Sequence, residues 1–172
     1  PLSGTGDTTT YTYDTNGYLS SVTDPAGLET QITSVDWRGA PLTIEDPNGV
    51  STTFTYDIRG RMLTATINPG ASQSEYQFEY TAMGDLSKLT LPGGSYLQYT
   101  YDDARRVTQV TNDRGETQNF TYDANGDPTA QTIKDASSTI TQQQTAAYDE
   151  LGRIIQSIGA GSQTTGFAYN KV

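Results

Sequence analysis

The stretch YDIRGRM, residues 56–62, returns along the chain with only small changes. YDTNGYL starts at residue 13, YDANGD at 122 and YDELGRI at 148. Aligning these copies gives one slot, usually Tyr, at Tyr13, Val35, Tyr56, Tyr80, Tyr101, Tyr122, Tyr148 and Tyr169. The interval is about 21 residues, with two small insertions. A phrase that recurs at a nearly fixed interval indicates a repeat architecture.

Each copy carries the signature of a turn. Asp follows the Tyr slot in most copies, at Asp14, Asp36, Asp57, Asp102, Asp123 and Asp149. Gly stands three residues after that position, at Gly17, Gly39, Gly60, Gly84, Gly126 and Gly152. The pattern suits a type I turn in which the Asp side chain accepts backbone hydrogen bonds and a left-handed Gly ends the turn. Arg105 breaks the glycine column, so its replacement by Gly is predicted to stabilise the protein by roughly 1 kcal/mol.

A second turn is predicted about ten residues after the first. Its copies are DPAG at 24–27, DPNG at 46–49, NPG at 68–70, LPGG at 91–94 and NDRG at 112–115. Pro25, Pro47 and Pro92 are expected in the second turn position, where the fixed φ of proline is already suitable. Each repeat therefore contains two turns and two connecting segments.

The segments between the turns alternate in polarity. Phe54 and Tyr56 alternate with Thr53 and Thr55, and a period of two is typical of β-strands. We therefore expect an all-β fold of tandem β-hairpins that form a long curved antiparallel sheet. Residues 1–172 would make a single array of about seven repeats, or about fourteen strands, truncated at both ends. The tyrosines are expected in the interior, so that Tyr56→Ala would cost about 3 kcal/mol or more.

Composition excludes several classes of function. The chain has no Cys and no His, which removes thiolate metal sites, the commonest general base and the commonest metal ligand. Its net charge is −10 and its basic residues are scattered, which argues against nucleic acid as a partner. No apolar run approaches a membrane helix, and no leader precedes the repeats. We predict no catalytic residue, no cofactor and no metal, and a soluble chain without its own targeting signal.

Three groups of residues have alternative interpretations. The Asp column could bind calcium, but we favour hydrogen bonds within each turn because the Gly of the same turn follows. Arg61, Arg106 and Arg153 follow the glycine slot and either pair with acidic residues on an adjoining hairpin or remain solvated. The tyrosines could stack on carbohydrate, but their phase favours a structural stack with hydroxyls reaching neighbouring strands.

The phrases YDIRGRM, YDELGRI, YDANGD and YDTNGYL resemble the YD repeat of the rearrangement-hotspot (RHS) proteins. The resemblance covers essentially the whole chain. It implies a β-sheet strip that spirals into a hollow shell, as in bacterial polymorphic toxins, the C components of ABC toxins and teneurins. The motif residues, expected to be structural, are Tyr13, Asp14, Gly17, Tyr56, Asp57, Gly60, Arg61, Tyr101, Asp102, Tyr122, Asp123, Gly126, Tyr148, Asp149, Gly152 and Arg153.

The resemblance also implies a function. The chain would be a non-enzymatic wall segment whose partners are the neighbouring repeats of its parent and an enclosed C-terminal toxin or effector domain. The parent would be secreted or delivered by a bacterial secretion system, with type VI as one candidate. Two alternatives stay open, a cell-surface carbohydrate-binding or adhesion module and a glycosidase-like enzyme that uses two acidic residues.

Overall fold

The computed structural model describes residues 8–68 and 72–170. Fifteen strands lie in this part of the chain, together with one short 3-10 turn, η1, at Ala160–Ser162. The strands are β1 Thr10–Tyr13, β2 Leu19–Thr23, β3 Glu29–Val35, β4 Pro41–Glu45, β5 Ser51–Tyr56, β6 Met62–Asn68, β7 Ser74–Tyr80, β8 Leu86–Thr90, β9 Tyr96–Tyr101, β10 Val107–Asn112, β11 Thr117–Tyr122, β12 Pro128–Lys134, β13 Ile140–Tyr148, β14 Ile154–Ile158 and β15 Thr164–Gly166. The predicted all-β class is confirmed.

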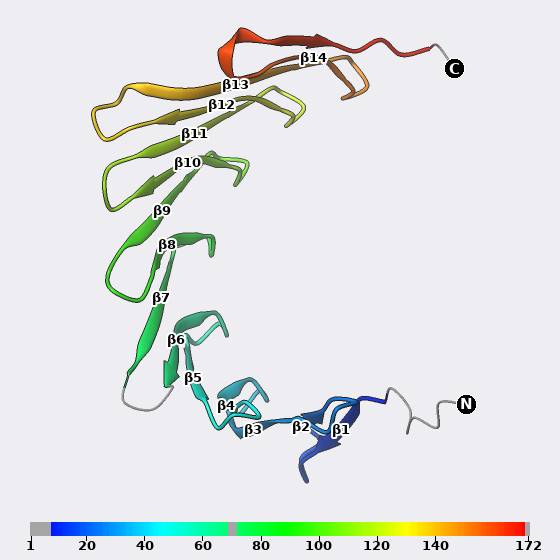
Figure 1. Ribbon diagram of the computed structural model, residues 1–172, viewed down its shortest axis with the longest axis vertical. Coiled ribbons are helices and arrows are strands. Elements are labelled where there is room, and N and C mark those ends of the chain that lie inside the picture. The colour runs from blue at the N-terminus through cyan, green and yellow to red at the C-terminus, as the bar shows by residue number, and fades with distance from the viewer. Residues whose placement is uncertain (1–7, 69–71, 171–172) are drawn as a thin grey trace. The chain divides into compact units, whose positions relative to one another are not determined.

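The strands pair in the order in which they occur in the sequence, from β1 to β15, in one open antiparallel sheet (Figure 1). This is the arrangement that tandem hairpins produce. The sheet has one strand more than the fourteen expected, because the segment before Tyr169 forms β15, which pairs with β14. Close packing divides the chain into two compact units, residues 1–78 with 90–94 and residues 79–89 with 95–172.

Cross-strand pairing sorts the side chains of each unit onto two faces. In the first unit Phe54 lies opposite Ala65, which lies opposite Tyr76. In the second unit Tyr99 lies opposite Val110. We call this side of each unit the aromatic face. Its members in the two units include Tyr11, Val22, Ile32, Ile44, Phe54, Tyr56, Ala65, Ile67, Tyr76, Leu97, Tyr99, Tyr101, Val110, Phe120 and Tyr122.

The opposite side of each unit is polar and is called here the threonine face. Hydroxyl groups on neighbouring strands form hydrogen bonds with each other across it, for example Thr55 Oγ1 with Thr64 Oγ1 at 2.7 Å and Thr121 Oγ1 with Thr129 Oγ1 at 2.9 Å. Such cross-strand pairs add to the stability of a sheet that has polar groups on one side. The threonine face is the more exposed of the two along β5, β7 and β9.

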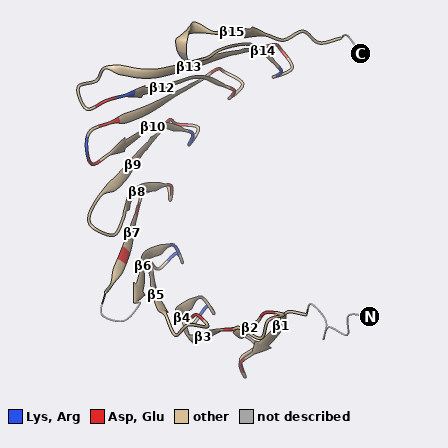
Figure 2. Cartoon of the chain, in the orientation of Figure 1, with Lys and Arg blue, Asp and Glu red and all other residues tan. Residues whose placement is uncertain are grey.

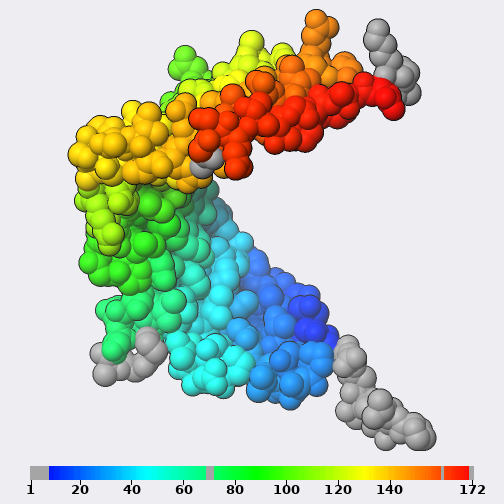
Figure 3. Space-filling model, turned by 45° about the horizontal axis from the view of Figure 1, so that its top comes forward, coloured from blue at the N-terminus to red at the C-terminus, as the bar shows by residue number. Residues whose placement is uncertain are grey.

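The prediction that the tyrosines lie buried in an interior is wrong. Among the described residues no hydrophobic side chain is fully buried, and the buried ones are the polar Ser21 and Thr66. A sheet of one layer covers each side chain only with its neighbours in the same sheet, so the aromatic residues are half-buried at most positions. On the side seen in Figure 3, much of β13 and all of β15 lie open to solvent. Strand pairing and cross-strand contacts, not a central core, hold each unit together.

The turns of the second type differ at one place from the expectation. Asp24 and Asp46 begin turns with Pro25 and Pro47 in the second position, as predicted. At 91–94 Gly94 N–H donates to the Leu91 carbonyl, and Gly93 has φ of 92°. A positive φ at the third position is typical of a type II turn, which needs Gly there and no Asp. The predicted turn at 68–70 falls mostly outside the described residues.

Candidate functional site: the YD-turn edge

The predicted motif residues gather at the turns that follow the Tyr slot, called here the YD turns. They comprise residues 14–17, 36–39, 57–60, 81–84, 102–105, 123–126 and 149–152. In the turn at 57–60, Asp57 Oδ1 accepts the backbone N–H groups of Arg59 at 2.8 Å and Arg61 at 2.9 Å. Gly60 N–H donates to the Asp57 carbonyl, and Gly60 has φ of 82°. One carboxylate therefore satisfies two donors that the turn would otherwise leave unpaired.

The same geometry recurs along the chain. Asp14, Asp36, Asp123 and Asp149 each accept two or more backbone N–H groups of their own turn through Oδ1. Asp102 accepts one, from Arg106. A positive φ is found at all six motif glycines, Gly17, Gly39, Gly60, Gly84, Gly126 and Gly152. The predicted hydrogen bonds within the turns are thus present.

The carboxylates of these turns are placed for hydrogen bonding. Across the described ranges, no three Asp or Glu side chains lie close enough together to hold a metal ion. The Asp of each turn accepts hydrogen bonds from the backbone of its own turn. The chemistry of the edge is therefore that of turn capping and ion pairing.

The arginines after the glycine slot pair differently from the expectation. Arg61, Arg106 and Arg153 each form an ion pair with the Asp of their own turn, at 2.6 to 2.7 Å from Asp57, Asp102 and Asp149. Neither of the two open alternatives, pairing with acidic residues on an adjoining hairpin or a solvated charge, describes these ion pairs. The reason is geometric, because the turn brings positions four residues apart together and the second carboxylate oxygen of the Asp remains available.

These arginines nevertheless reach the next repeat through its tyrosine. The guanidinium of Arg106 lies over the ring of Tyr122, 4.5 Å from the ring centre, and that of Arg153 lies over Tyr169 at 4.4 Å. A cation over an aromatic ring is stabilised by the negative face of the ring. Each of these arginines therefore joins its own turn to the following hairpin.

The tyrosine hydroxyls also connect strands. Tyr56 donates its hydroxyl to the carbonyl of Pro41 at 2.9 Å, and Tyr101 donates to Leu86 at 2.6 Å. Further along, the hydroxyls of Tyr122, Tyr148 and Tyr169 donate to the carbonyls of Val107, Pro128 and Ile154. Each of these carbonyls belongs to the first residue of a strand, β4, β8, β10, β12 or β14. The predicted reach to a neighbouring strand is confirmed, whereas Tyr13 lies on β1 with 63% of its surface exposed.

The strand ends at these tyrosines are irregular. The register shifts beside Tyr13, Tyr56, Tyr122 and Tyr148, each time at the last residue before the turn. A bulge of this kind follows from a type I turn that ends in a left-handed residue, and it increases local twist. The motif therefore fixes both the turn and the direction of the tyrosine.

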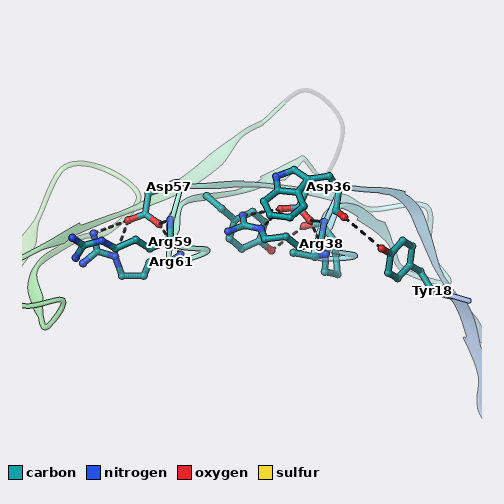
Figure 4. A network of polar contacts seen from close by, with 10 residues as sticks. Tyr18, Asp36, Arg38, Asp57, Arg59 and Arg61 are labelled. Atoms are coloured by element: carbon teal, nitrogen blue, oxygen red, sulfur yellow. Dashed lines mark hydrogen bonds and ion pairs between the residues drawn. The ribbon is translucent and has the colours of Figure 1, made fainter. Parts of the chain in front are cut away.

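At several steps the residue after the turn glycine lies against the glycine of the next YD turn. The ring of Tyr18 lies so close to Gly39 that a Cβ there would overlap it. Asp127 occupies the same position against Gly152, 3.4 Å from where a Cβ would stand. In the turn at 36–39 the position after glycine is Ala40, and Arg38 takes over, with Nη1 2.8 Å from a Cβ at Gly60. Figure 4 shows Tyr18, Arg38 and Arg61 following one another along this edge.

Arg105 shows what happens when the slot is not glycine. It adopts the left-handed conformation with φ of 64°, as predicted. The residue that faces it from the preceding turn is Asp85, and its carboxylate accepts from Arg105 Nη2 at 2.6 Å and from Nε at 3.1 Å. An ion pair thus replaces the contact with glycine at this one step.

Hydrogen bonding and charge lower the pKa of several turn carboxylates. The backbone hydrogen bond from Arg61 holds the pKa of Asp57 below its usual value, and the Arg61 side chain adds to this against the opposing effect of burial. The side chain of Arg105 lowers the pKa of Asp85, and that of Arg153 lowers the pKa of Asp149. Burial raises the pKa of Tyr56 and of Tyr101. The carboxylates are thus held in the charged form and these tyrosines in the neutral form.

One part of the second unit is hollowed. A depression of about 620 Å³ lies over β11 to β14 in the second unit. Phe120, Tyr122, Ala130, Ala146 and Ile154 line it. The depression is open and mostly apolar, and it carries none of the charged motif residues. It can contact an apolar chain segment but offers no group for acid–base chemistry.

Sequence reasoning missed the contacts between successive turns. The signal was present in the positions after the glycine slot, Tyr18, Arg61, Asp85, Arg106, Asp127 and Arg153, which recur at the interval of the repeat. Asp85 in particular stands twenty residues before Arg105, the residue that breaks the glycine column. Comparing the glycine positions with the positions that follow them would have indicated the pair of Asp85 and Arg105.

Comparison with known proteins agrees with this repeat geometry. Residues 38–73 and 80–117 match the family model for the RHS Repeat. A curated relative, double-stranded DNA deaminase toxin A of Burkholderia cenocepacia (strain H111), is 31% identical over 123 residues. The match covers 70% of this chain and 8% of that protein. The chain therefore spans a small part of the relative it matches.

Solved structures share the fold. The crystal structure of TcdB2-TccC3-Cdc42 superposes with a TM-score of 0.75 at 16% identity, covering 86% of this chain and 9% of that one. The Photorhabdus luminescens Tc holotoxin pore with the mutation TccC3-D651A superposes with a TM-score of 0.53 at 13% identity, covering 90% and 12%. At these identities the likeness concerns the fold. The two matches to the family model identify residues 38–73 and 80–117 of this chain as RHS repeats.

Proposed function

We propose that the chain is a structural segment in the wall of a hollow β-shell that encloses a C-terminal toxin or effector domain. The observation that carries the proposal is the uninterrupted pairing of strands in sequence order, since such a sheet can be lengthened by adding hairpins at either edge. In this proposal residues 1–172 form one array, because the same YD turns occur in both compact units. The motif residues keep the array in register and carry no catalytic role.

The two faces of each unit suit a wall. One side presents half-buried aromatic and aliphatic residues and the other presents hydroxyl and amide groups. Whichever face points inward, the wall presents a mostly apolar surface on one side and a polar surface on the other. The tyrosine hydroxyl bonds, the contacts of Arg106 and Arg153 with the next tyrosine ring and the ion pair of Arg105 with Asp85 hold adjacent hairpins together without a central core.

The parent protein is proposed to be a bacterial toxin that is secreted or delivered, the type VI apparatus being one candidate route. The support is the curated relative, whose name is that of a toxin and which is far longer than this chain. No helix among the described residues is long and apolar enough to cross a membrane. The enclosed domain would then lie in a part of the parent outside this sequence.

Carbohydrate recognition by the tyrosines is less well supported. A sugar-stacking tyrosine needs a free ring face and usually an accessible hydroxyl. Here the hydroxyls of Tyr56, Tyr101 and Tyr122 donate to backbone carbonyls, and the guanidinium of Arg106 covers one face of Tyr122. These contacts favour a structural role for the tyrosines.

Enclosure can be tested by cross-linking in the parent protein. The chain has no Cys, so single cysteines can be placed on opposite faces of one strand, Ala65→Cys with Thr64→Cys and Ala146→Cys with Thr145→Cys. Each variant is labelled with a photoreactive maleimide and irradiated. We expect a cross-link to the C-terminal domain from one face only, the same face in both pairs. Cross-links from neither face, or equally from both, would contradict enclosure.

A further inference from the structure

Strand β13 leaves part of its edge without a partner strand inside the second unit. The step from Tyr122 to Tyr148 takes 26 residues against the usual 21, and β13 has nine residues where β14 has five. Pairing with β14 stops at Thr145, which lies opposite Ile158. The first five residues of β13, Ile140–Gln144, pair with β12 on one side, and among the described residues no strand lies on their other side. Figure 1 shows the hairpin of β12 and β13 reaching past the turn that joins β14 to β15.

This open edge offers backbone groups that no neighbouring strand takes up. Successive residues of a strand direct their N–H and C=O groups to opposite sides, so roughly two or three of the five residues direct both groups away from β12. All five are exposed, whereas the last four residues of β13, which lie beside β14, are half-buried. The register against β12 is regular from Gln142 to Gln144. A strand laid here would continue the ladder that β14 begins.

A groove of about 370 Å³ runs along the same edge. Ile140 and Gln142 line it from β13, and Ile158 and Gly159 line it from the end of β14. Ile140 has 53% of its surface exposed. Nothing lies within 4 Å of where a Cβ would stand at Gly159 or Gly161. The groove is therefore open, and its isoleucines offer apolar contacts beside the polar amide of Gln142.

The edge also lacks the charges that usually protect a free strand. Natural sheets block open edges with charged side chains, Pro or bulges. Residues 136–148 contain no Lys, Arg, Asp, Glu or Pro, and β13 is uncharged along its length (Figure 2). The register shift of β13 against β12 lies at its start, between Ile140 and Gln142. The regular part of the edge is thus accessible to a strand that carries no charge.

We propose that the open edge of β13, residues 140–144, binds an extended segment of another polypeptide as an added antiparallel strand. The segment is uncharged, and its β-branched side chains contact Ile140 and Ile158. In strand addition, backbone hydrogen bonds provide affinity and the flanking side chains provide selectivity. The antiparallel direction is that of β14, whose ladder the segment continues. The site does not rest on the proposed enclosure, because hairpins added beside β1 or β15 leave this internal edge open.

Other occupants fit these observations less well. The edge has no basic side chain to pair with the phosphates of a nucleic acid or of an anionic bilayer. A second copy would bring together two chains of net charge −10. Their contact would comprise about five residues a side, against roughly 20–30 in a stable interface. An uncharged segment avoids this repulsion, and strand addition needs only a short length of chain.

Amide hydrogen exchange of the full chain, followed for each residue by NMR, locates the added strand. The probe is the capped peptide Thr-Val-Thr-Gln-Thr-Val-Thr. Its counterpart is the same peptide with every backbone nitrogen methylated, which keeps the side chains and removes the backbone donors. We expect alternate amides within Ile140–Gln144 to exchange about tenfold more slowly when the peptide is present at about ten times its Kd. The methylated peptide should leave their exchange unchanged.

Two isoleucine variants form a matched pair. Ile140→Ser removes an apolar side chain of the groove and should weaken peptide binding by about fivefold. Ile155→Ser removes an isoleucine of β14 that is 40% exposed and lies outside the groove lining, and it should bind the peptide as the unchanged chain does.

The proposal is overturned if the amides of residues 140–144 are not slowed by the peptide up to about 1 mM, the affinity of a weak isolated site. An equal effect of the methylated peptide, or equal binding by Ile140→Ser and Ile155→Ser, would also overturn it. Slowing of the same amides as the concentration of the chain rises without peptide would identify a second copy as the occupant, and the proposal would then be wrong.

Discussion

At the scale of single residues, Arg105 combines an unfavourable backbone with a favourable side chain. A left-handed conformation costs a residue with a Cβ roughly 1–2 kcal/mol relative to Gly. The guanidinium recovers part of this through its contact with Asp85. The stabilisation predicted from sequence for Arg105→Gly considered only the backbone.

The two contributions can be separated by a double-mutant cycle. We expect Arg105→Gly to be more stabilising in an Asp85→Asn background than in the unchanged chain, because the ion pair is already lost there. Urea unfolding of the four proteins gives the difference. An equal effect of Arg105→Gly in both backgrounds would show that the contact with Asp85 contributes nothing to stability.

Tyr56 illustrates the effect of a sheet without a core. Tyr56→Phe removes the hydroxyl that donates to the Pro41 carbonyl and should cost about 1 kcal/mol in the free energy of unfolding. Tyr56→Ala should cost about 2 kcal/mol, less than expected from the sequence, because the ring is only half-buried. The control is Tyr11→Phe, at a ring more than half exposed, which should change stability by less than about 0.5 kcal/mol. Equal losses in Tyr56→Phe and Tyr11→Phe would exclude a role for the hydroxyl bond.

At the scale of the turn and its hairpin, Gly17 and Gly39 form a matched pair. Both have a positive φ, 86° and 83°, so Ala at either position pays the same backbone strain. Nothing lies within 4 Å of a Cβ at Gly17, whereas a Cβ at Gly39 would overlap the ring of Tyr18. Gly39→Ala should therefore destabilise by more than Gly17→Ala, by about 1–3 kcal/mol.

Removal of the opposing ring is the control for this contact. In a Tyr18→Ala background the excess cost of Gly39→Ala over Gly17→Ala should disappear, as measured by urea unfolding. If the excess persists without the ring, the glycine at position 39 is required for a reason other than the contact between successive turns.

The turn carboxylates make stability depend on pH. Asp57, Asp102 and Asp149 have a pKa below their ordinary value in the folded protein, through backbone and side-chain hydrogen bonds. Such groups stabilise the fold above the unfolded pKa of about 3.9, and the contribution is lost as the pH falls through the lower folded value. We expect the free energy of unfolding to be level above about pH 5 and to fall below about pH 4.

Asp57→Asn tests the assignment, because the amide keeps an oxygen acceptor for the turn but does not titrate. Unfolding free energies measured from pH 7 to pH 2 should fall less steeply for Asp57→Asn than for the unchanged chain. An identical slope in the two proteins would show that Asp57 does not contribute to the acid transition.

The hairpins were predictable because each turn and each strand is defined by residues that lie a few positions apart in the sequence. Asp and Gly three residues apart define a turn, and the alternation of residues such as Thr55 and Tyr56 defines a strand, so both can be read from neighbouring letters. Ordered pairing follows, since consecutive hairpins pair with the nearest strand. The type II turn at Gly93 was missed because Gly at two successive positions allows more than one turn.

The site was less predictable because it depends on contacts between repeats. Arg61 pairs with Asp57 of its own turn and not with an acidic residue of a neighbouring hairpin. Which of these partners it takes depends on the conformation of its side chain, and the spacing of residues in the sequence does not give that conformation. The exposure of Trp37 is similar, because an aromatic residue in the sequence indicates burial by default. Only the position of Trp37 at the tip of a turn places it in solvent.

At the scale of the whole molecule, a sheet whose described residues include no fully buried hydrophobic side chain depends on its neighbours in the array. Each hairpin gains stability from the ones beside it, and isolated hairpins are marginal in water. A wall that encloses a cargo requires this property, because it can extend over many repeats without a compact core. The apolar depression over β11 to β14 would be covered in the parent if that face contacts cargo.

The most direct test of the account is cryo-electron microscopy of the full-length parent protein. Enclosure predicts that the YD hairpins of this chain form part of a closed wall, with density of the C-terminal domain inside it. An extended strip with both faces open to solvent, and the C-terminal domain outside it, would contradict the account.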